Sequence, residues 1–269
     1  MGKDGLTRSS SAIRRGGLVF GVGSLHHLPF QTQRVRLLRQ ALETGFRSFD
    51  VAPAYGNGLN ELELGLALHS YGADCQVTTK FGIPVDLYGA RHPHLFFLLR
   101  GIRRLLDSRY SEEYKRRMLS PGEMTGSLEG SLRRLKRDYV DNFMIHEPLG
   151  ILTTAQIADL HKTASRLKEA GKLLRWGVCG PATSIGQLVH DPEFDVFQFP
   201  LDDIEKVGPQ PSRRRIGYGV HRFYLTSSCS RNISFPEFVS DRLKNLSIDL
   251  IVATTSRIHL NPFRECFQQ

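Results

Sequence analysis

The sequence has little of what disulfide-bonded, zinc-stabilised or membrane-spanning proteins need. Its 269 residues contain four cysteines that lie far apart, with no Cys-x-x-Cys pair: Cys75, Cys179, Cys229 and Cys266. This spacing argues against a structural zinc site, so we expect no metal, and free thiols in a reducing, cytoplasmic compartment. Residues 1–17 lack the apolar segment of a secretory signal. No run approaches the roughly 20 apolar residues that span a bilayer, so we expect no transmembrane segment.

Two common nucleotide-binding motifs are also missing. The segment Gly21–Gly23 is followed by His26 where a dinucleotide-binding turn needs its third glycine, and Gly217–Gly219 is followed by Arg222. Neither a phosphate-binding Gly-x-x-x-x-Gly-Lys motif nor a Gly-x-Ser-x-Gly nucleophile turn occurs. Dinucleotide binding on an open sheet of the usual kind is therefore disfavoured.

The overall composition is that of a folded globular protein with a basic excess. Hydrophobic residues make up 40% and charged residues 23% of the chain, which excludes disorder and collagen-like repeats. The formal charge of +9 comes from 36 basic and 27 acidic residues. Such an excess fits an anionic partner, which is a nucleic acid, a membrane surface or a phosphate-bearing cofactor.

Short apolar runs alternate with stretches of helical spacing along the whole chain, which predicts parallel strands joined by helices. The predicted strands are Leu18–Val22, Arg47–Val51, Gln76–Lys80, Val140–Ile145, Leu174–Cys179, Val196–Phe199, Gly219–Leu225 and Leu250–Ala253. The predicted helices are Gln31–Glu43, Asn60–His69, Glu123–Arg137, Thr154–Gly171, Ser184–His190, Phe235–Asn245 and Ile258–Phe267. Eight such units favour a single (β/α)8 TIM barrel domain over residues 1–269, with an open doubly wound sheet as the competing architecture.

Residues 83–121 interrupt this alternation after the third strand, and we interpret them as a helical insertion. Apolar residues between Leu95 and Leu106 recur at i, i+3 and i+4, which predicts a helix with one apolar face and one arginine-bearing face. We expect this helix to pack on the barrel; the alternative is contact with a membrane surface or a partner through residues 95–119. The position of the insertion after the third strand also suggests a roof over a substrate pocket.

Polar residues stand at or just beyond the ends of three successive predicted strands: Asp50, Tyr55, Lys80 and His146. Each alone has a structural explanation, as a helix cap, a half-buried aromatic, a solvated strand end or a satisfied core histidine. Together, at the end of the barrel where reactive groups gather, they favour a site. We expect Lys80 to lower the pKa of Tyr55 from about 10 and Asp50 to keep Lys80 charged. His146 would then donate a hydrogen bond to a carbonyl oxygen.

Several segments around these residues resemble the aldo-keto reductase family. Gly45–Gly56 resembles the signature that carries the family's catalytic aspartate and tyrosine, and Thr78–Gly82 resembles the strand that carries its lysine. Ser127–Leu135 and Asp138–Pro148 are similar to the helix and strand that deliver the histidine, and Gly171–Val178 to the start of the fifth strand. The matches run in family order along nearly the whole chain.

The resemblance implies a barrel that binds NADPH, or alternatively NADH, in extended form without a Rossmann domain and without a metal. Hydride would pass to the carbonyl carbon while Tyr55 protonates the oxygen, or the reverse. For the cofactor, the resemblance points to six residues, Gln198, Cys179, His221, Thr254, Thr255 and Arg257. Cys179-Gly180 stands where the family usually has Ser-Asn, and Tyr218 and Tyr224 are alternatives to His221 as the stacking aromatic. Arg264 is the second choice after Arg257 as a phosphate ligand. We interpret Arg213–Arg215 as a solvated connector.

The favoured function is therefore an NADPH-dependent carbonyl reductase or alcohol dehydrogenase acting on an aldehyde, ketone or sugar. The second reading is a cofactor-binding redox sensor or regulatory barrel, motivated by the departure at Cys179. The third is a basic nucleic-acid or membrane binder. We expect a small carbonyl or alcohol as partner and no nucleic acid; substrate identity, direction of reaction and oligomeric state stay open.

Overall fold

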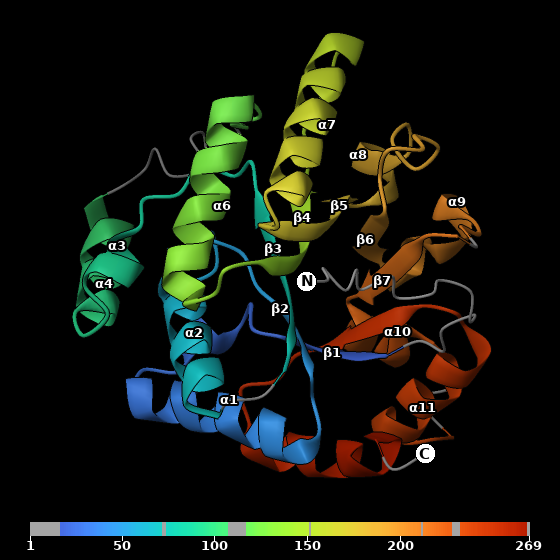
Figure 1. Cartoon of the computed structure of the whole chain (residues 1–269). Coiled ribbons are helices and arrows are strands. Elements are labelled where there is room, and N and C mark those ends of the chain that lie inside the picture. The colour runs from blue at the N-terminus through green and yellow to red at the C-terminus, as the bar shows by residue number, and fades with distance from the viewer. Residues whose placement is uncertain are drawn as a thin grey trace, which may run out of the picture.

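Eight parallel strands form a closed barrel in the computed structural model, which describes residues 17–71, 74–106, 117–150, 152–210, 212–227 and 232–267 (Figure 1). The strands are β1 (Leu18–Gly21), β2 (Ser48–Asp50), β3 (Gln76–Phe81), β4 (Val140–His146), β5 (Leu173–Cys179), β6 (Val196–Pro200), β7 (Arg214–Tyr218) and β8 (Asp249–Val252). Each strand pairs with the next in sequence, and β8 pairs with β1. The predicted (β/α)8 TIM barrel is confirmed.

Helices connect the strands and cover the outside of the barrel. The α-helices are α1 (Gln31–Thr44), α2 (Leu59–Tyr71), α3 (Tyr88–Arg91), α4 (Phe96–Leu106), α6 (Pro121–Leu135), α7 (Thr154–Glu169), α8 (Ala182–Ile185), α9 (Ile204–Val207), α10 (Val220–Thr226) and α11 (Phe235–Asn245). The 3-10 helices are η1 (Leu25–His27), η2 (Leu201–Asp203) and η4 (Arg257–Phe267). Within the described residues, none of these helices is both long enough and apolar enough to cross a membrane.

Two apolar layers follow from the alternation of side chains along the strands. A small cluster contains Val19, Met144, Cys179, Val196, Ile216 and Ile251, one residue or more from most of the strands. The strand neighbours of these residues, such as Phe143 and Phe197, belong to a second, larger cluster that includes the helices. Phe143 stacks on Phe81 with ring centres 5.3 Å apart. This packing fixes which face of each strand points into the barrel.

Three of the helices begin with a reciprocal cap that the sequence encodes locally. Ser120, Thr153 and Ser234 each accept a hydrogen bond from the backbone N–H three residues later, and the Glu or Gln at that position accepts one from the cap's own N–H. Each such cap contributes about 1 kcal/mol. The starts of α6, α7 and α11 are therefore set by short-range chemistry.

The insertion forms α3 and α4, which lie outside α2 and α6 at the edge of the molecule (Figure 1). Phe96 anchors α4, stacking on Tyr88 with ring centres 5.7 Å apart and packing near Leu59. Leu98 and Ile102 of the predicted apolar face are 61% and 43% exposed, so this part of the face is not packed on the barrel. Residues 107–116 of the predicted insertion lie outside the described residues.

The predicted seventh strand was wrong, because Gly219–Leu225 contains helix α10 and the strand is β7, five residues earlier. Gly219 adopts a left-handed φ of +71° and begins the helix. The supposed connector Arg213–Arg215 contributes to β7: Arg214 Nε lies 2.5 Å from Asp249 Oδ2 and Arg214 Nη1 donates to Gln76 Oε1 at 2.9 Å. These tertiary partners allow two arginines in a barrel strand.

Two predicted helices also differ in form. The region predicted as the helix Ser184–His190 contains only the end of α8, which stops at Ile185. The last helix is the 3-10 helix η4, which carries Pro262 in its interior. Proline lacks the N–H that a continuous α-helix would need at that position.

Candidate active site

The alternation of β2, β3, β4 and β6 directs four polar side chains into the carboxyl end of the barrel. Phe49, Phe81 and Phe197 belong to the outer apolar layer, so their strand neighbours point the other way. These inward side chains are Asp50, Lys80, His146 and Gln198, and all four are buried. The strand pattern therefore explains why polar residues gather at one end of an apolar core.

Lys80 and Asp50 form a buried ion pair between neighbouring strands. Lys80 Nζ donates to both carboxylate oxygens of Asp50, at 2.7 and 2.8 Å, and to the carbonyl of Val51 at 3.2 Å. The two side chains are 0% and 5% exposed. Charges so far from water need this degree of hydrogen bonding to stay ionised.

Tyr55 reaches the same place from the turn that follows β2. Its N–H donates to the carbonyl of Ala52 at 3.0 Å, and Asn60 Nδ2 ties the turn to β1 by donating to the carbonyl of Val22 at 2.6 Å. The ring of Tyr55 lies 5.2 Å from Lys80 Nζ and meets His146 edge-on, with ring centres 5.8 Å apart. The structure thus brings together all four residues expected at the strand ends.

Burial decides the protonation states of the two central groups. Burial lowers the pKa of Lys80, but the Asp50 carboxylate outweighs it and the net pKa is raised, so Lys80 stays charged as expected. Burial raises the pKa of Tyr55 well above 10, and the opposing effect of Lys80 is smaller. The expectation that Lys80 brings the net pKa of Tyr55 down was therefore wrong, and Tyr55 is a neutral phenol that carries a proton.

His146 is also held neutral. Burial lowers its pKa well below the usual 6.5, and the positive charges of Lys80 and Arg117 lower it further. A neutral imidazole donates one N–H and accepts at the other nitrogen. Beside the protonated Tyr55, it provides a second neutral hydrogen-bonding group at the same place.

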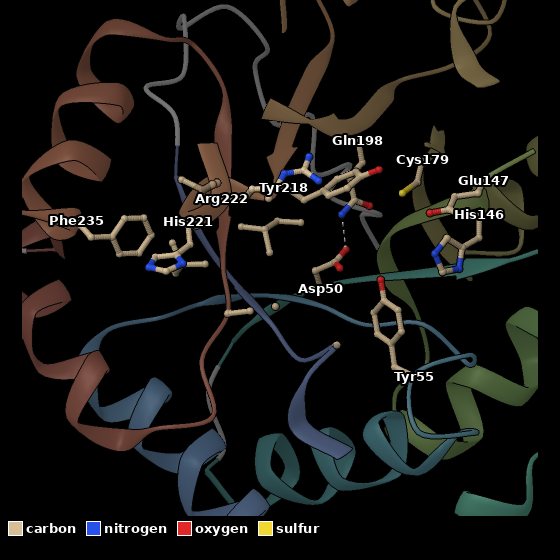
Figure 2. Close-up of a pocket in the computed structure, with 17 residues that line it drawn as sticks. Asp50, Tyr55, His146, Glu147, Cys179, Gln198, Tyr218, His221, Arg222 and Phe235 are labelled. Atoms are coloured by element: carbon tan, nitrogen blue, oxygen red, sulfur yellow. Dashed lines mark hydrogen bonds between the residues drawn. The ribbon is translucent and has the colours of Figure 1, made fainter. Parts of the chain in front are cut away.

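These groups open into a cleft of about 250 Å³ at the carboxyl end of the barrel (Figure 2). Tyr55 and His146 line one side of it, His221 and Phe235 line the opposite side, and Asp50 and Tyr218 lie between them. Gly21 and Gly23 also line it. A Cβ on Gly21 would come within 2.7 Å of Ile251 Cγ2, so this wall needs glycine to stay open.

Gln198 shows what kind of group the cleft can accept. Its Nε2 donates to Asp50 Oδ1 at 3.0 Å, drawn as the dashed line in Figure 2. A carboxylate only accepts, so the amide orientation is fixed and Oε1 is left over. Oε1 is buried and has no partner among the described residues. Gln198 is therefore ready to accept a hydrogen bond from a ligand, and a carboxamide NH₂ of a nicotinamide fits that acceptor.

Cys179 and His221, the other expected neighbours of a nicotinamide, also line the cleft. Burial raises the pKa of the Cys179 thiol to about 12, so it is neutral. Tyr218 ends β7 and lines the cleft, whereas His221 lies on α10. The sequence favoured His221 over Tyr218 as the stacking aromatic because it predicted the seventh strand at Gly219–Leu225, whereas β7 ends at Tyr218. Tyr224, the other alternative, donates to the carbonyl of Ile233 at 2.8 Å and is not among the cleft-lining residues.

The three residues expected at the far end of the cofactor lie in the loop after β8 and at the start of η4. Thr254 lines a second cavity of about 310 Å³ that shares His221 and Phe235 with the cleft. Thr255 and Arg257 line a third, of about 560 Å³, which Arg36 also lines. Arg257 bonds to Gln40, and Arg264 is exposed. The cofactor candidates thus line three cavities, the first at the barrel mouth and the third beside α1.

The insertion does not form the expected roof within the described residues, since none from 83–121 is among those lining the cleft. Arg117, at the end of the insertion, contacts the site by donating from Nε to the carbonyl of Glu147 at 2.7 Å. Sequence reasoning missed Glu147, which follows His146 and lines the cleft. The signal available was a carboxylate directly after the candidate histidine. No cluster of three or more metal-ligating side chains occurs in the described part of the chain.

Comparison with known proteins gives a consistent picture. The model of the aldo/keto reductase family matches residues 17–198, more than half of the chain. The aldo-keto reductase YhdN of Bacillus subtilis (strain 168) is 30% identical over 144 residues, which span 54% of this chain and 36% of that protein. The match thus covers only about a third of that relative's length.

Solved structures with the same fold are more distant in sequence. The glycerol dehydrogenase AKR11B4 from Gluconobacter oxydans is 17% identical, with a TM-score of 0.69 over 93% of this chain and 86% of that one. An aldo-keto reductase from Klebsiella pneumoniae in complex with NADPH is 17% identical, with a TM-score of 0.66 over 95% and 86% of the two chains. At this identity the likeness extends to the fold.

Proposed function

The chain belongs to the aldo/keto reductase family, and from this we propose that it is an NADPH-dependent oxidoreductase that interconverts a small carbonyl compound and its alcohol. NADH is the alternative cofactor. The observation that carries the proposal is a neutral Tyr55 beside the Lys80–Asp50 pair, opening into a cleft with an unused acceptor on Gln198. Aldehydes, ketones and sugars are the substrate classes to test.

The reaction divides the work between cofactor and protein. A bound nicotinamide supplies the hydride that adds to the carbonyl carbon. Tyr55 gives its phenolic proton to the carbonyl oxygen, and the Lys80 ammonium, held charged by Asp50, stabilises the phenolate that results. His146 donates a hydrogen bond from its neutral ring to the same oxygen and orients it. In the oxidative direction Tyr55 receives the proton instead.

The residues that we assign to cofactor binding line the cleft and the two other cavities. Gln198 would accept a hydrogen bond from the carboxamide of the nicotinamide, and Cys179, Tyr218 and His221, which line the same cleft, would contact its ring. Thr254, Thr255 and Arg257 would hold the phosphate-bearing end. The aldo-keto reductase from Klebsiella pneumoniae solved with NADPH supports this choice of cofactor.

The test replaces Tyr55 by Phe and follows nicotinamide absorbance with a panel of aldehydes, ketones and sugars. Loss of the proton donor should lower turnover roughly 10²- to 10⁴-fold. NADPH affinity, measured by quenching of nicotinamide fluorescence, should stay within about twofold, since the hydroxyl is not among the proposed cofactor contacts. A Phe variant that keeps the wild-type rate contradicts the assignment of the donor.

A regulatory barrel without turnover is the second candidate, because Cys179-Gly180 stands where the family usually has Ser-Asn. A redox sensor needs a thiolate at neutral pH, and burial raises the pKa of Cys179 to about 12. This disfavours redox sensing at that cysteine. Cofactor binding without reduction of any carbonyl in the panel would favour the regulatory candidate.

Contact with a membrane surface or partner through residues 95–119 is a further proposal, supported by the exposed Leu95 just before α4 and the exposed Leu98 and Ile102 on it. Sedimentation with anionic and neutral lipid vesicles tests it. We also propose one barrel domain with residues 83–121 as its insertion, and a cytoplasmic location. The free thiols of Cys75 and Cys179, both buried, support the reducing compartment.

A further inference from the structure

Glu147 has a left-handed backbone conformation, which is unfavourable in free energy for a residue with a side chain. It follows His146 at the end of β4 and has a φ of +48°, in the left-handed region that favours glycine. A non-glycine residue held there costs of order 1 kcal/mol, and such positions cluster at functional sites. The chain therefore has a carboxylate at a position where glycine would adopt the same backbone conformation with less strain.

Arg117, near the end of the insertion, holds this backbone conformation in place. Its side chain is only 5% exposed, and its Nε donates to the Glu147 carbonyl at 2.7 Å. The next residue, Met118, donates its N–H to the carbonyl of Gly82 at 2.8 Å, which ties this segment to the end of β3. The Glu147 N–H donates to the Cys179 carbonyl at 2.7 Å. Both backbone polar groups of Glu147 are thus fixed.

The carboxylate itself faces the cleft. Glu147 lines the cleft next to His146 and Cys179, with its side-chain oxygen directed towards the space between them and Tyr218 (Figure 2). Its negative charge contributes to the raised pKa of Cys179 and of Tyr218, after the larger effect of burial. The side chain is 37% exposed, so a ligand can reach it.

Other charged side chains of the described residues lie at or near the cleft, and one of them pairs with Glu147. Asp50 is neutralised by Lys80, and Arg222 lies 2.5 Å from Asp202 in an exposed pair. Arg117 pairs with Glu147 through Nη2, which lies 3.7 Å from Oε2, so it offsets part of the charge; the contact is longer than a hydrogen bond, and the Nε of Arg117 donates to the Glu147 carbonyl. The part of the cleft beside Tyr55 and His146 therefore presents a carboxylate with accepting capacity.

We propose that Glu147 is a specificity-determining residue, which favours carbonyl substrates with a cationic or hydrogen-bond-donating group and disfavours those with a carboxylate. A carboxylate accepts hydrogen bonds from hydroxyl or ammonium groups and repels another carboxylate. The inference rests on the proposed carbonyl reduction, since it assigns the selectivity of that same cleft.

The test uses Glu147→Gln, which removes the charge but keeps the size and the backbone. The substrates are benzaldehydes that carry an amidino, a nitro or a carboxylate group in the para position. In the wild type, kcat/KM should rank the amidino compound first and the carboxylate last. The ratio of these two should fall at least about tenfold in the variant, as expected for one charge interaction at partly solvated range. Glu193→Gln removes an exposed carboxylate outside the cleft lining and should keep the wild-type ratio.

An unchanged ratio in Glu147→Gln overturns the proposal. Failure to reduce these three aldehydes and every carbonyl of the wider panel contradicts the proposed function instead, and calorimetric titration with benzamidine and benzoate then decides the role of Glu147 without turnover. Preference for benzamidine that is lost in Glu147→Gln supports the proposal, and equal binding of the two ions to the wild type contradicts it.

Discussion

The ion pairs Arg34–Glu63 and Lys80–Asp50 are both withdrawn from water, but their surroundings differ. Arg34 on α1 makes a two-pronged contact with Glu63 on α2, at 2.7 and 2.8 Å, and both side chains are at most 1% exposed. The remaining donor of Arg34 serves the carbonyls of Leu28 and Pro29. This pair joins two helices outside the barrel.

The Lys80–Asp50 pair is equally buried but borders a cleft. Asp50 also accepts from Gln198, whose oxygen has no partner among the described residues, and Tyr55 lies beside the ammonium. Burial of a charge pair by itself thus does not identify a site. Hydrogen-bonding capacity that is left unused and faces a cavity distinguishes the reactive pair from the structural one.

Replacing each pair by apolar residues of similar size should separate the two roles most strongly. Buried ion pairs replaced in this way often keep their stability, because the desolvation cost disappears with the charges. Arg34→Met with Glu63→Leu should therefore leave turnover within about twofold, while Lys80→Met with Asp50→Leu should lower it roughly 10³-fold. Turnover is followed by nicotinamide absorbance and folding by circular dichroism. Equal losses in two folded variants would break the comparison.

A second test compares glutamines at the two ends of the barrel. Gln198→Met removes the unused acceptor and should weaken NADPH binding about tenfold, the cost of one lost hydrogen bond in a buried site. Gln76 accepts from Arg214 at the amino end of the barrel, so Gln76→Met should lower stability and leave NADPH affinity unchanged. Fluorescence titration and denaturant unfolding measure the two effects. Loss of affinity in the Gln76 variant alone would reverse the assignment.

The smallest effect concerns pH and the neutral His146. The pKa of His146 is lowered in the fold, so the unfolded chain binds a proton that the folded chain does not. Stability is therefore lost as pH falls below the unfolded pKa of about 6.5, by at most about 2 kcal/mol at pH 5. His146→Gln should remove this part of the slope, measured by urea unfolding at pH 7 and pH 5. A variant whose stability falls as steeply as the wild type would show that His146 is not the group responsible.

Much of the fold followed from local patterns in the sequence. The strands up to β6 and helices such as α11 were predicted closely, because their apolar period and caps are encoded within a few residues. The seventh strand was not. Arg214 and Arg215 hide its period, and their partners Asp249 and Gly208 come together with them only in the fold. The Val220–Thr226 segment is rich in residues that favour strands, yet forms α10.

Some features of the site could also be predicted from the sequence, and others depend on tertiary contacts. The strand ends predicted that Asp50, Lys80 and His146 lie together, because carboxyl ends of parallel strands share one rim. The direction of the Tyr55 pKa shift was wrong, since burial at that point depends on everything packed around the ring. The strained backbone of Glu147 is also a product of tertiary contacts, above all with Arg117. The chemical roles of all these residues stay predictions until the variants are measured.

The amide of Gln198 links β6 to Asp50 on β2, on the other side of the barrel. The same group orients Asp50 through its nitrogen and is proposed to bind the ligand through its oxygen. Turning it to suit a ligand with the opposite polarity would set an oxygen against the carboxylate of Asp50. A variant that binds a different group at this point would first have to change the Asp50–Lys80 pair beside the proton donor, and one that changed that pair would lose the contact that orients Gln198. Such mutual dependence makes stepwise drift at either position difficult.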